Sequence, residues 1–465
     1  MNRSIHPSSY VDPAGTIFEA EDQIYRGIRS EFAEFYSDLL KNSVIRQMLG
    51  QTIVETEIDT SVLPDIKGYD LILRHRRLSP LSFCYEWPAL MLKDAALLTL
   101  DICINLLPER IVLQDAYPWN ILFDSTRPIL VDFTSIVPQD KNLPWVAYHQ
   151  FCQFFLFPLI ISCYLPSKVR RLLLMDYLGG IGDYELLQMM PKKAVVRMPW
   201  IITRILVPRA ILAITKWLKI ENKIIDLSAE LSPEKEARLR FFKSLRKNVT
   251  AIPVRIRKTL WSQYYTNIES FFGKSEFNPK QAAVASILEK IGPKTVVDIG
   301  CNRGGYAILA AQRGAKVIAF DTDEDSVAFL YETAKEKQLP ILPLVMDILN
   351  PSPGCGWRTQ QFAAAPPRFR SEMALALALV HHLAITQRQT FDRIVLALAD
   401  YAEKWLLTEF IPLDDPRVRE LMATHRREMD WYSLENYLEA LSGSFNGIDT
   451  FPSHPEGRTL ILCHK

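Results

Sequence analysis

One pattern dominates the C-terminal half of this 465-residue chain, where short apolar segments alternate with helical segments. Short continuous apolar runs are typical of strands that are buried on both faces of a parallel sheet. The alternation therefore predicts an α/β fold with βαβ units and a mostly parallel sheet. Strands are expected at 295–299, 316–320, 341–346, 373–380 and 405–411, and helices at 281–291, 306–313, 325–337 and 391–404.

The end of the chain predicts a different arrangement. Residues 447–451 and 458–463 are two β-like runs, and the turn residues P-S-H-P-E-G join them. Two closely spaced runs of this kind favour an antiparallel hairpin. We therefore expect a terminal hairpin at one edge of the parallel sheet.

The composition excludes several classes of protein. Because 48% of the residues are hydrophobic, the chain can offset the entropy of ordering, which excludes disorder as its main state. The 54 Lys and Arg residues nearly balance the 53 Asp and Glu residues, so no specific nucleic-acid partner is expected. The most apolar run, at 151–165, is shorter than the ~20 residues of a transmembrane helix and predicts a buried core helix.

The cysteines indicate a reducing compartment. All seven are widely spaced, and no C-x-x-C pair occurs that would indicate a zinc ribbon or a redox motif. An odd and sparse set of cysteines fits reduced thiols. We therefore expect a cytoplasmic protein.

A basic stretch separates the two halves. Residues 192–258 contain 17 Lys and Arg but 5 Asp and Glu, mostly in segments with helical spacing. One interpretation is a positive face for phosphate, an anionic glycan or peripheral contact with a membrane. The other is a solvated helix face between two domains. Breakers at Pro233 and Pro253 place the boundary near 245–255, so the domains are expected at 1–250 and 251–465.

The strongest motif is V-V-D-I-G-C-N-R-G-G-Y, which lies between an expected strand and an expected helix. Gly300 and Gly304 allow the backbone to turn sharply and to approach a ligand closely. Asp298, at the end of the strand, can accept hydrogen bonds from a ligand ammonium group or order the loop. Asn302 stands where such turns often have a third glycine. A turn in this position is typical of nucleotide-binding folds.

Two more acidic residues follow the next two strands. Asp321 comes directly after the second strand, where a carboxylate can accept both hydroxyls of a ribose. Asp347 follows the third strand and is placed to accept a hydrogen bond from an adenine amine, beside the backbone of Ile348. Because the carboxyl ends of parallel strands share one crevice, Asp298, Asp321 and Asp347 are expected to converge on one nucleoside.

The acid before the first glycine bears on the choice of cofactor. It would repel the pyrophosphate of a dinucleotide, but it suits the cationic amino-acid end of S-adenosylmethionine. Over residues 269–465 the chain resembles class I S-adenosylmethionine-dependent methyltransferases. The resemblance implies a Rossmann-like methyltransferase domain with S-adenosylmethionine as its cofactor. The cofactor-binding residues would be Asp298, Gly300, Asn302, Gly304, Asp321, Asp347 and Ile348.

The run A-L-V-H-H-L closes the fourth expected strand and contains His381 and His382. In the methyltransferases that the chain resembles, the methyl acceptor sits beside this strand end. A neutral imidazole there can take a proton from an acceptor hydroxyl or amine, which makes both histidines candidate catalytic residues. A role in supporting the cofactor loop is the alternative, since methyl transfer depends mainly on approach and alignment.

The N-terminal half contains L-Q-D-A-Y-P-W-N-I-L-F, followed by V-D-F. This spacing is similar to the catalytic and metal loops of protein kinases and aminoglycoside phosphotransferases. The resemblance implies an α+β kinase-like domain in which Asp115 orients the attacking hydroxyl, while Asn120 and Asp132 hold magnesium beside ATP. Leu113 replaces the usual His, and Arg26 stands where a phosphate-binding Lys would sit. These departures favour a scaffold or acceptor-recognition role over phosphotransfer.

The whole arrangement looks like a bacterial family that includes a host-specific nodulation protein of root-nodule bacteria. The motifs that carry this resemblance are L-Q-D-A-Y-P-W-N-I-L-F, A-L-A-L-V-H-H-L-A-I and L-T-E-F-I-P-L-D-D-P-R-V. The resemblance implies methylation in the making or decorating of a glycan or lipo-oligosaccharide signal. The expected partner is therefore a small-molecule or glycan acceptor, methylated on a hydroxyl.

Two alternative functions stay open at this stage. The first is a phosphotransferase in the N-terminal half, which would use ATP and magnesium. The second is a regulatory protein without catalysis, in which the methyltransferase fold binds its cofactor as a sensor. The sequence leaves the oligomeric state open.

Overall fold

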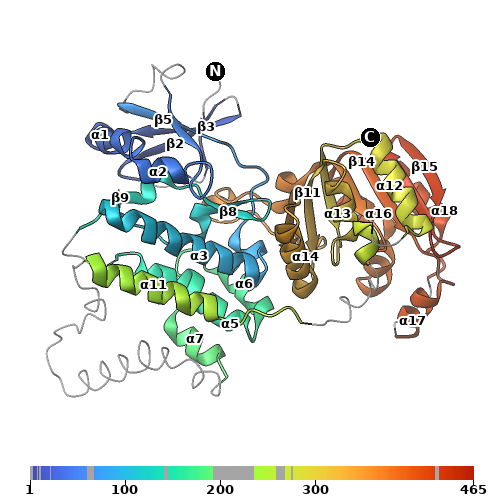
Figure 1. The fold of residues 1–465 in the computed structure, drawn as a ribbon. Helices are drawn as coiled ribbons and strands as arrows, with labels where there is room; N and C mark the ends of the chain where they lie inside the picture. Colours follow the sequence, from blue (N-terminus) through green and yellow to red (C-terminus); the bar gives the residue numbers. More distant parts are fainter. Residues whose placement is uncertain are drawn as a thin grey trace.

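The two halves of the chain form two bodies that lie side by side (Figure 1). The computed structural model describes residues 4–7, 9, 12–20, 22–59, 68–140, 145–191, 235–257, 268–273, 276–424 and 429–465. A small antiparallel sheet and a group of helices make up the N-terminal half. One large sheet, covered by helices, makes up the C-terminal half.

A seven-stranded sheet lies at the centre of the C-terminal half, in the order β12-β11-β10-β13-β14-β16-β15. The first five strands in this order run parallel, and β16 and β15 are antiparallel at one edge. The Rossmann-like sheet with its terminal hairpin is therefore confirmed. The strands are β10 (Thr295–Ile299), β11 (Lys316–Asp321), β12 (Ile341–Val345), β13 (Ser371–Ala376), β14 (Ala402–Phe410), β15 (Gly447–Pro452) and β16 (Thr459–His464).

Helices cover both faces of this sheet, because its strands are nearly continuous apolar runs whose successive side chains point to opposite faces. On β10, Val296 belongs to one buried cluster, whereas Val297 and Ile299 belong to another. The first helix begins after Asn278, whose side chain accepts the amide of Gln281 as a cap. The helices are α12 (Pro279–Ile291), α13 (Gly305–Ala311), α14 (Glu324–Glu336), α15 (Ala365–Phe369), α16 (Phe391–Ala399), α17 (Pro416–Thr424) and α18 (Leu434–Ser442).

Two of the expected elements end earlier in the structure than the sequence predicts. The strand expected at 373–380 ends at Ala376, because Ala378 has a φ of 52° and its amide donates to the Glu409 carboxylate at 2.9 Å. The chain therefore turns although its residues remain apolar. The helix expected at 391–404 ends at Ala399, because Ala402 already pairs with Ser371 of β13. Both boundaries depend on contacts between segments that are distant in sequence.

The N-terminal half begins with a five-stranded antiparallel sheet, in the order β1-β2-β3-β5-β4. Its elements are β1 (Ser4–Ile5), β2 (Gly15–Ala20), β3 (Gln23–Ile28), α1 (Ser30–Leu39), α2 (Ser43–Met48), β4 (Thr56–Ile58) and β5 (Leu71–His75). Two short antiparallel strand pairs follow the long helix α3 (Ala89–Leu106). They pair β6 (Ile111–Leu113) with β9 (Ile136–Pro138) and β7 (Ile121–Asp124) with β8 (Arg127–Leu130). The arrangement is α+β, and its kinase-like identity remains a prediction.

The apolar run at 151–165 forms a buried helical segment, as predicted. It comprises α4 (Tyr148–Phe151), a π-helical turn (Cys152–Leu156) and α5 (Phe157–Ser162). Phe155, Leu159 and Ile160 are fully buried there. Two further helices, α6 (Pro166–Met175) and α7 (Asp183–Met189), follow. Among the helices that the structure describes, none is long and apolar enough to cross a lipid bilayer.

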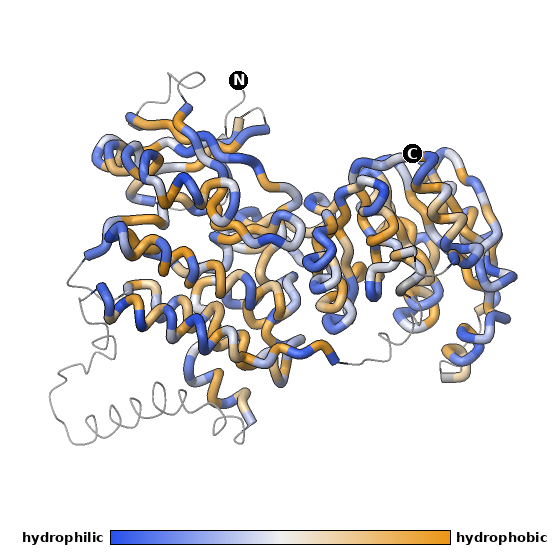
Figure 2. Tube along the Cα trace, viewed as in Figure 1, coloured by the Kyte–Doolittle hydropathy of each residue, from blue (hydrophilic) through white to orange (hydrophobic). Residues whose placement is uncertain are grey.

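The basic stretch is described only in part, because residues 192–234 lie outside the described ranges. The membrane contact predicted for this stretch falls mainly on those residues. The described part forms α11 (Lys235–Ala251), which lies along α3 (Figure 1). Figure 2 shows more hydrophilic residues on α11 than on α3. Arg246 of α11 forms an ion pair with Asp101 of α3. The domain boundary after residue 250 remains a prediction.

The two halves share a packed interface. Helix α14 faces α3, and the Tyr331 hydroxyl donates to the Asp94 carboxylate at 2.5 Å (Figure 1). Arg368 of the C-terminal half forms a bidentate pair with Glu86, whose side chain is fully buried. Residues of both halves belong to one continuous apolar cluster. The interface therefore buries both apolar surface and charge.

Candidate functional site

A cavity of about 360 Å³ lies at the carboxyl ends of β10, β11, β12 and β13. Five of the seven predicted cofactor-binding residues line it, from three successive strand ends. They are Gly300, Asn302, Asp321, Asp347 and Ile348. The other two are not among the lining residues, since Asp298 is buried near the end of β10 and Gly304 caps α13. The structure thus brings the predicted constellation to one edge of the sheet.

The turn after β10 requires its glycines. Gly300, Asn302 and Gly304 all have a positive φ, of 71°, 50° and 77°. Such values are readily adopted by glycine and tolerated by asparagine. A Cβ atom at Gly304 would overlap the side chain of Leu330, and one at Gly300 would lie 3.0 Å from Leu379. The glycines therefore allow the turn after β10 to approach α14 and the loop after β13 closely.

The carboxylates in this region accept hydrogen bonds mainly from backbone amides. Asp321 accepts from the amides of Asn302 at 2.8 Å and Asp323 at 2.9 Å. Asp347 accepts from the amide of Leu349 at 2.9 Å. Burial raises the pKa of Asp321 above its usual range. These bonds orient the two side chains and leave lone pairs on their oxygens for a ligand.

Asp298 is the most deeply buried of the three acids, at 3% exposed. Its Oδ2 atom has no hydrogen-bond donor among the described residues. Burial raises the pKa of Asp298 to about 7, although the amide of Ala307 opposes the shift. A buried acceptor without a donor is costly unless a ligand supplies the partner. These acceptor oxygens therefore fit a ligand that carries an ammonium group and hydroxyls.

The two histidines occupy different positions. His382 lines the cavity, whereas His381 is 3% exposed and is not among the lining residues. Burial lowers the pKa of His382 to about 4, so its imidazole is neutral near pH 7. Burial and the charges of Arg458 and Lys280 hold the pKa of His381 well below its usual value. His382 therefore has the position and the charge state of a proton acceptor.

A buried network holds the loop after β13, and its centre is Glu409, for which L-L-T-E-F-I-P left two roles open, in the acceptor pocket or in the structure. Glu409 is fully buried and accepts from Lys280 Nζ at 2.6 Å, from Ser453 Oγ at 2.6 Å and from the amide of Ala378 at 2.9 Å. Glu409 does not line the cavity. Its carboxylate instead holds the turn that leads to His382.

The predicted residues of the N-terminal half also come together. Asp115, Asn120 and Asp132 line a second cavity, of about 390 Å³. Asp132 is paired with Arg26 at 2.9 Å, and Asn120 donates to Asp132 at 3.3 Å. Asp12, which the sequence did not indicate, pairs with the same arginine at 3.1 Å. Among the described residues, no cluster of three or more His, Cys, Asp or Glu is arranged to hold a metal ion.

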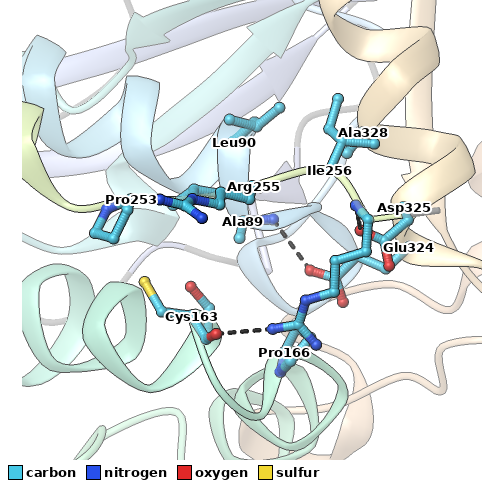
Figure 3. A pocket seen from close by; sticks show the side chains of 13 residues that line it. Ala89, Leu90, Cys163, Pro166, Pro253, Arg255, Ile256, Glu324, Asp325 and Ala328 are labelled. Carbon is cyan, nitrogen blue, oxygen red and sulfur yellow. Dashed lines mark hydrogen bonds between the residues drawn. The ribbon is translucent and has the colours of Figure 1, made fainter. Parts of the chain in front are cut away.

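A third cavity, of about 370 Å³, lies between the halves (Figure 3). The amide of Ala89 donates to Glu324 at 3.2 Å across the interface, and Arg257 donates to the carbonyl of Cys163 at 2.7 Å. Arg170 also pairs with Glu324. The dashed lines in Figure 3 mark the contacts of Ala89 with Glu324 and of Arg257 with Cys163, which join the two halves. None of the predicted site residues lines this cavity.

Comparison with known proteins identifies the C-terminal half. The family described as "Tellurite resistance protein TehB" matches residues 264–352. A probable S-adenosyl-L-methionine-dependent methyltransferase TehB of Haemophilus influenzae (strain 10810) is 30% identical over 86 residues, which are 18% of this chain and 30% of that protein. These matches contain the glycine turn and the strand ends of Asp298, Asp321 and Asp347.

A second relative matches almost the whole chain. The nodulation protein NoeA of Rhizobium meliloti (strain 1021) is 28% identical over 463 residues, which are 98% of this chain and 95% of that protein. A solved structure of magnesium protoporphyrin IX methyltransferase from Synechocystis PCC 6803, with bound SAH, covers 45% of this chain and 100% of its own. Its sequence identity is 16% and its TM-score 0.30. The C-terminal half is thus an S-adenosylmethionine-dependent methyltransferase domain that is similar to TehB over residues 264–352, and the chain is similar to NoeA over nearly its full length.

Proposed function

We propose that the cavity at the carboxyl ends of β10–β13 binds S-adenosylmethionine, and that the enzyme methylates a hydroxyl of a glycan or lipo-oligosaccharide. One observation carries the cofactor assignment. Two acids at successive strand ends, Asp321 and Asp347, line this cavity, and Asp298, buried close to Asp321, lacks a donor for one of its oxygens among the described residues. When bound, S-adenosylmethionine supplies a methyl group that is activated on a sulfonium cation.

Each acid takes a different part of the cofactor in this proposal. The carboxylate of Asp298 accepts from the ammonium end, for which its orphaned oxygen is suited. Asp321 accepts from the ribose hydroxyls, since its two oxygens are already oriented by backbone amides. Asp347, with the backbone of Ile348, receives the adenine amine. The turn at Gly300, Asn302 and Gly304 provides the close backbone approach.

His382 is the proposed proton acceptor. Burial holds the pKa of His382 at about 4, so its imidazole is unprotonated near pH 7 and can accept a proton when the acceptor hydroxyl is methylated. His381 lies behind it, with the ring centroids 4.0 Å apart, and supports its orientation. The Glu409 carboxylate fixes the preceding turn through the Ala378 amide. The rest of the rate acceleration in this proposal comes from holding the acceptor hydroxyl in line with the methyl group.

The choice of acceptor rests on the relative NoeA, whose name describes it as a nodulation protein. A glycan hydroxyl is a weak nucleophile near neutral pH, so a neutral base beside the cavity is useful to it. The comparisons give no support to phosphotransfer with ATP and magnesium or to a purely regulatory role. The cytoplasmic location expected from the cysteines stays a prediction.

Isotope transfer tests this proposal. Purified protein is incubated with methyl-labelled S-adenosylmethionine and glycan extracts, and products are examined for the mass of one added CH₂ group. His382→Gln should lower the methylation rate about 100-fold or more, the usual contribution of a positioned base. His149→Gln, at an exposed position, is the matched control. An unchanged methylation rate in the His382 variant would refute the role of His382 as the base. If no glycan hydroxyl acquires the label, the proposed acceptor class is wrong.

A further inference from the structure

The second cavity, in the N-terminal half, has the composition of a ligand site that the methyltransferase reaction does not use. It lies between the hairpin of β2 and β3 and the loops that follow β6 and β8. Its volume of about 390 Å³ falls within the usual range of small-ligand pockets, roughly 300–1,000 Å³. Three carboxylates and one guanidinium line it, from Asp12, Asp115, Asp132 and Arg26.

The charge of this cavity disfavours an anionic ligand. Arg26 is held by Asp132 at 2.9 Å and by Asp12 at 3.1 Å, and its side chain is only 5% exposed. Two carboxylates therefore already compensate the single cation. Asp115 adds a third acid, whose pKa is raised to about 6 by burial and by the other two acids. A phosphate or carboxylate placed here would face an excess of like charge.

Two unused donors disfavour a purely cationic ligand. The Nε1 atom of Trp119 and the Nε atom of Arg26 are buried, and neither has an acceptor among the described residues. The two residues are 9% and 4% exposed, and both line the cavity. A cation offers only donors and would leave these groups unsatisfied. The missing partner must therefore accept hydrogen bonds from them as well as donate to Asp115.

A hydroxyl both donates and accepts, so a ligand with several hydroxyls satisfies all of these groups. The cavity also contains side-chain amides, from Gln114, Asn120 and Gln150, which can pair with hydroxyls in either direction. Tyr117 and Trp119 add a stacked aromatic pair, with ring centroids 4.6 Å apart. Aromatic walls suit the apolar C–H faces of a sugar ring. Together these features match a neutral cyclic polyol.

A segment of the methyltransferase half connects this cavity to the first one. Asp347 lines the methyltransferase cavity, and Phe362 lines the N-terminal one. Backbone hydrogen bonds of 3.0 Å in both directions join Cys355 to Phe362, which packs against Trp119 and Tyr177. The C-terminal half thus contributes a wall to the N-terminal cavity.

We propose that the N-terminal cavity is a saccharide-binding site, which holds a neutral sugar residue through Asp115, Asn120 and the indole N–H of Trp119. The inference rests on the proposed function, because it assigns this cavity to the sugar part of the glycan acceptor. Phe362 closes the site from the methyltransferase half. No phosphate is transferred there.

Calorimetry on the full chain tests this site without S-adenosylmethionine. The probes are chitotetraose, cellotetraose and maltotetraose, and ATP with magnesium is titrated separately. At least one oligosaccharide should bind, and Asp115→Asn and Trp119→Phe should each weaken it about tenfold, the loss of one buried hydrogen bond to a fixed partner. The matched controls Asp38→Asn and Trp357→Phe alter exposed residues and should leave affinity unchanged.

Each outcome decides between the alternatives. If none of the three oligosaccharides binds at about 10 mM, where even weak sites begin to fill, the inference is wrong. Binding of ATP with magnesium that Asp115→Asn abolishes would also overturn it. Thermal unfolding confirms that the variants are folded. Saccharide binding without S-adenosylmethionine binding would refute the proposed function alone, whereas normal methylation without saccharide binding here would refute this inference alone.

Discussion

The two polar cavities of this protein are built from the same residue type but differ in what their carboxylates contact. In the C-terminal cavity, Asp321 and Asp347 accept from backbone amides, and Asp298 keeps an oxygen without a donor among the described residues. In the N-terminal cavity, Asp12 and Asp132 share the guanidinium of Arg26. Acids held by backbone amides remain available to pair with a cationic ligand, whereas acids paired with an arginine already have a cation beside them.

The difference shows that a segment can match a known motif in residue spacing and still differ from it in the charges around its acids. The spacing of Asp115, Asn120 and Asp132 is similar to that of a phosphotransfer loop, and the fold does bring these residues together. The partner of Asp132 is nevertheless an internal cation. The comparison can be tested by changing the charges in each cavity separately.

The largest effect is expected from the ion pair that supports the C-terminal cavity. Lys280→Met leaves Glu409 buried without its cation and should lower the free energy of unfolding by about 3–5 kcal/mol. Lys404→Met breaks an exposed pair with Glu372 and should leave the free energy of unfolding almost unchanged. Urea denaturation measures both. Equal losses would show that Lys280 is not a buried structural cation.

A smaller effect is expected for cofactor affinity. Asp321→Ala removes a charge-assisted ribose contact and should weaken S-adenosylmethionine binding by roughly 1.5–3 kcal/mol. Asp392→Ala, at an exposed position on α16, is the control and should leave the affinity unchanged. Calorimetric titration gives the two values. The ribose role would be refuted by an unchanged affinity in the Asp321 variant.

The pH dependence of binding should follow Asp298. Its pKa is about 7 in the free protein, and a bound cation favours the ionised carboxylate, so the pKa falls on binding. Affinity should therefore be constant above pH 7 and decrease by up to about tenfold per pH unit below it. Asp298→Asn should abolish this dependence. A profile that stays the same in the variant would assign the titration to another group.

The smallest effect is expected from the N-terminal cavity. Arg26→Lys cannot bridge Asp12 and Asp132 in a fork and should cost about 1 kcal/mol of folding free energy. It should leave S-adenosylmethionine affinity unchanged, because Arg26 does not line the C-terminal cavity. Chemical denaturation and calorimetry measure the two quantities. A large loss of cofactor affinity would mean that the cavities are more strongly coupled than the contacts indicate.

The core of the C-terminal half could be predicted because its strands are nearly continuous apolar runs. The expected strand at 295–299 matches β10, and Asp321 and Asp347, at the ends of β11 and β12, line one cavity, whereas Asp298 is buried within β10 and does not. The end of β13 could not be predicted, because the turn at Ala378 depends on Glu409, a buried side chain from another strand. Sequence periodicity contains no information on such a contact.

The sequence predicted that most of the proposed cofactor-binding residues lie together, and five of the seven line one cavity, but it could not distinguish the two histidines. His381 and His382 are adjacent in sequence, and only their burial separates them, since His382 lines the cavity and His381 does not. In the N-terminal half, Asp12 could not be identified, because it pairs with Arg26 across the sheet from a segment without a motif. The contribution of Phe362 to a cavity of the other half depends on domain packing.

The most direct test of the central claim is a pair of calorimetric titrations of the full chain, one with S-adenosylmethionine and one with NAD. If the acids at 298, 321 and 347 hold a cationic nucleoside, S-adenosylmethionine binds saturably and NAD binds more weakly or not at all. Tighter binding of NAD, whose pyrophosphate these acids should repel, would contradict the account.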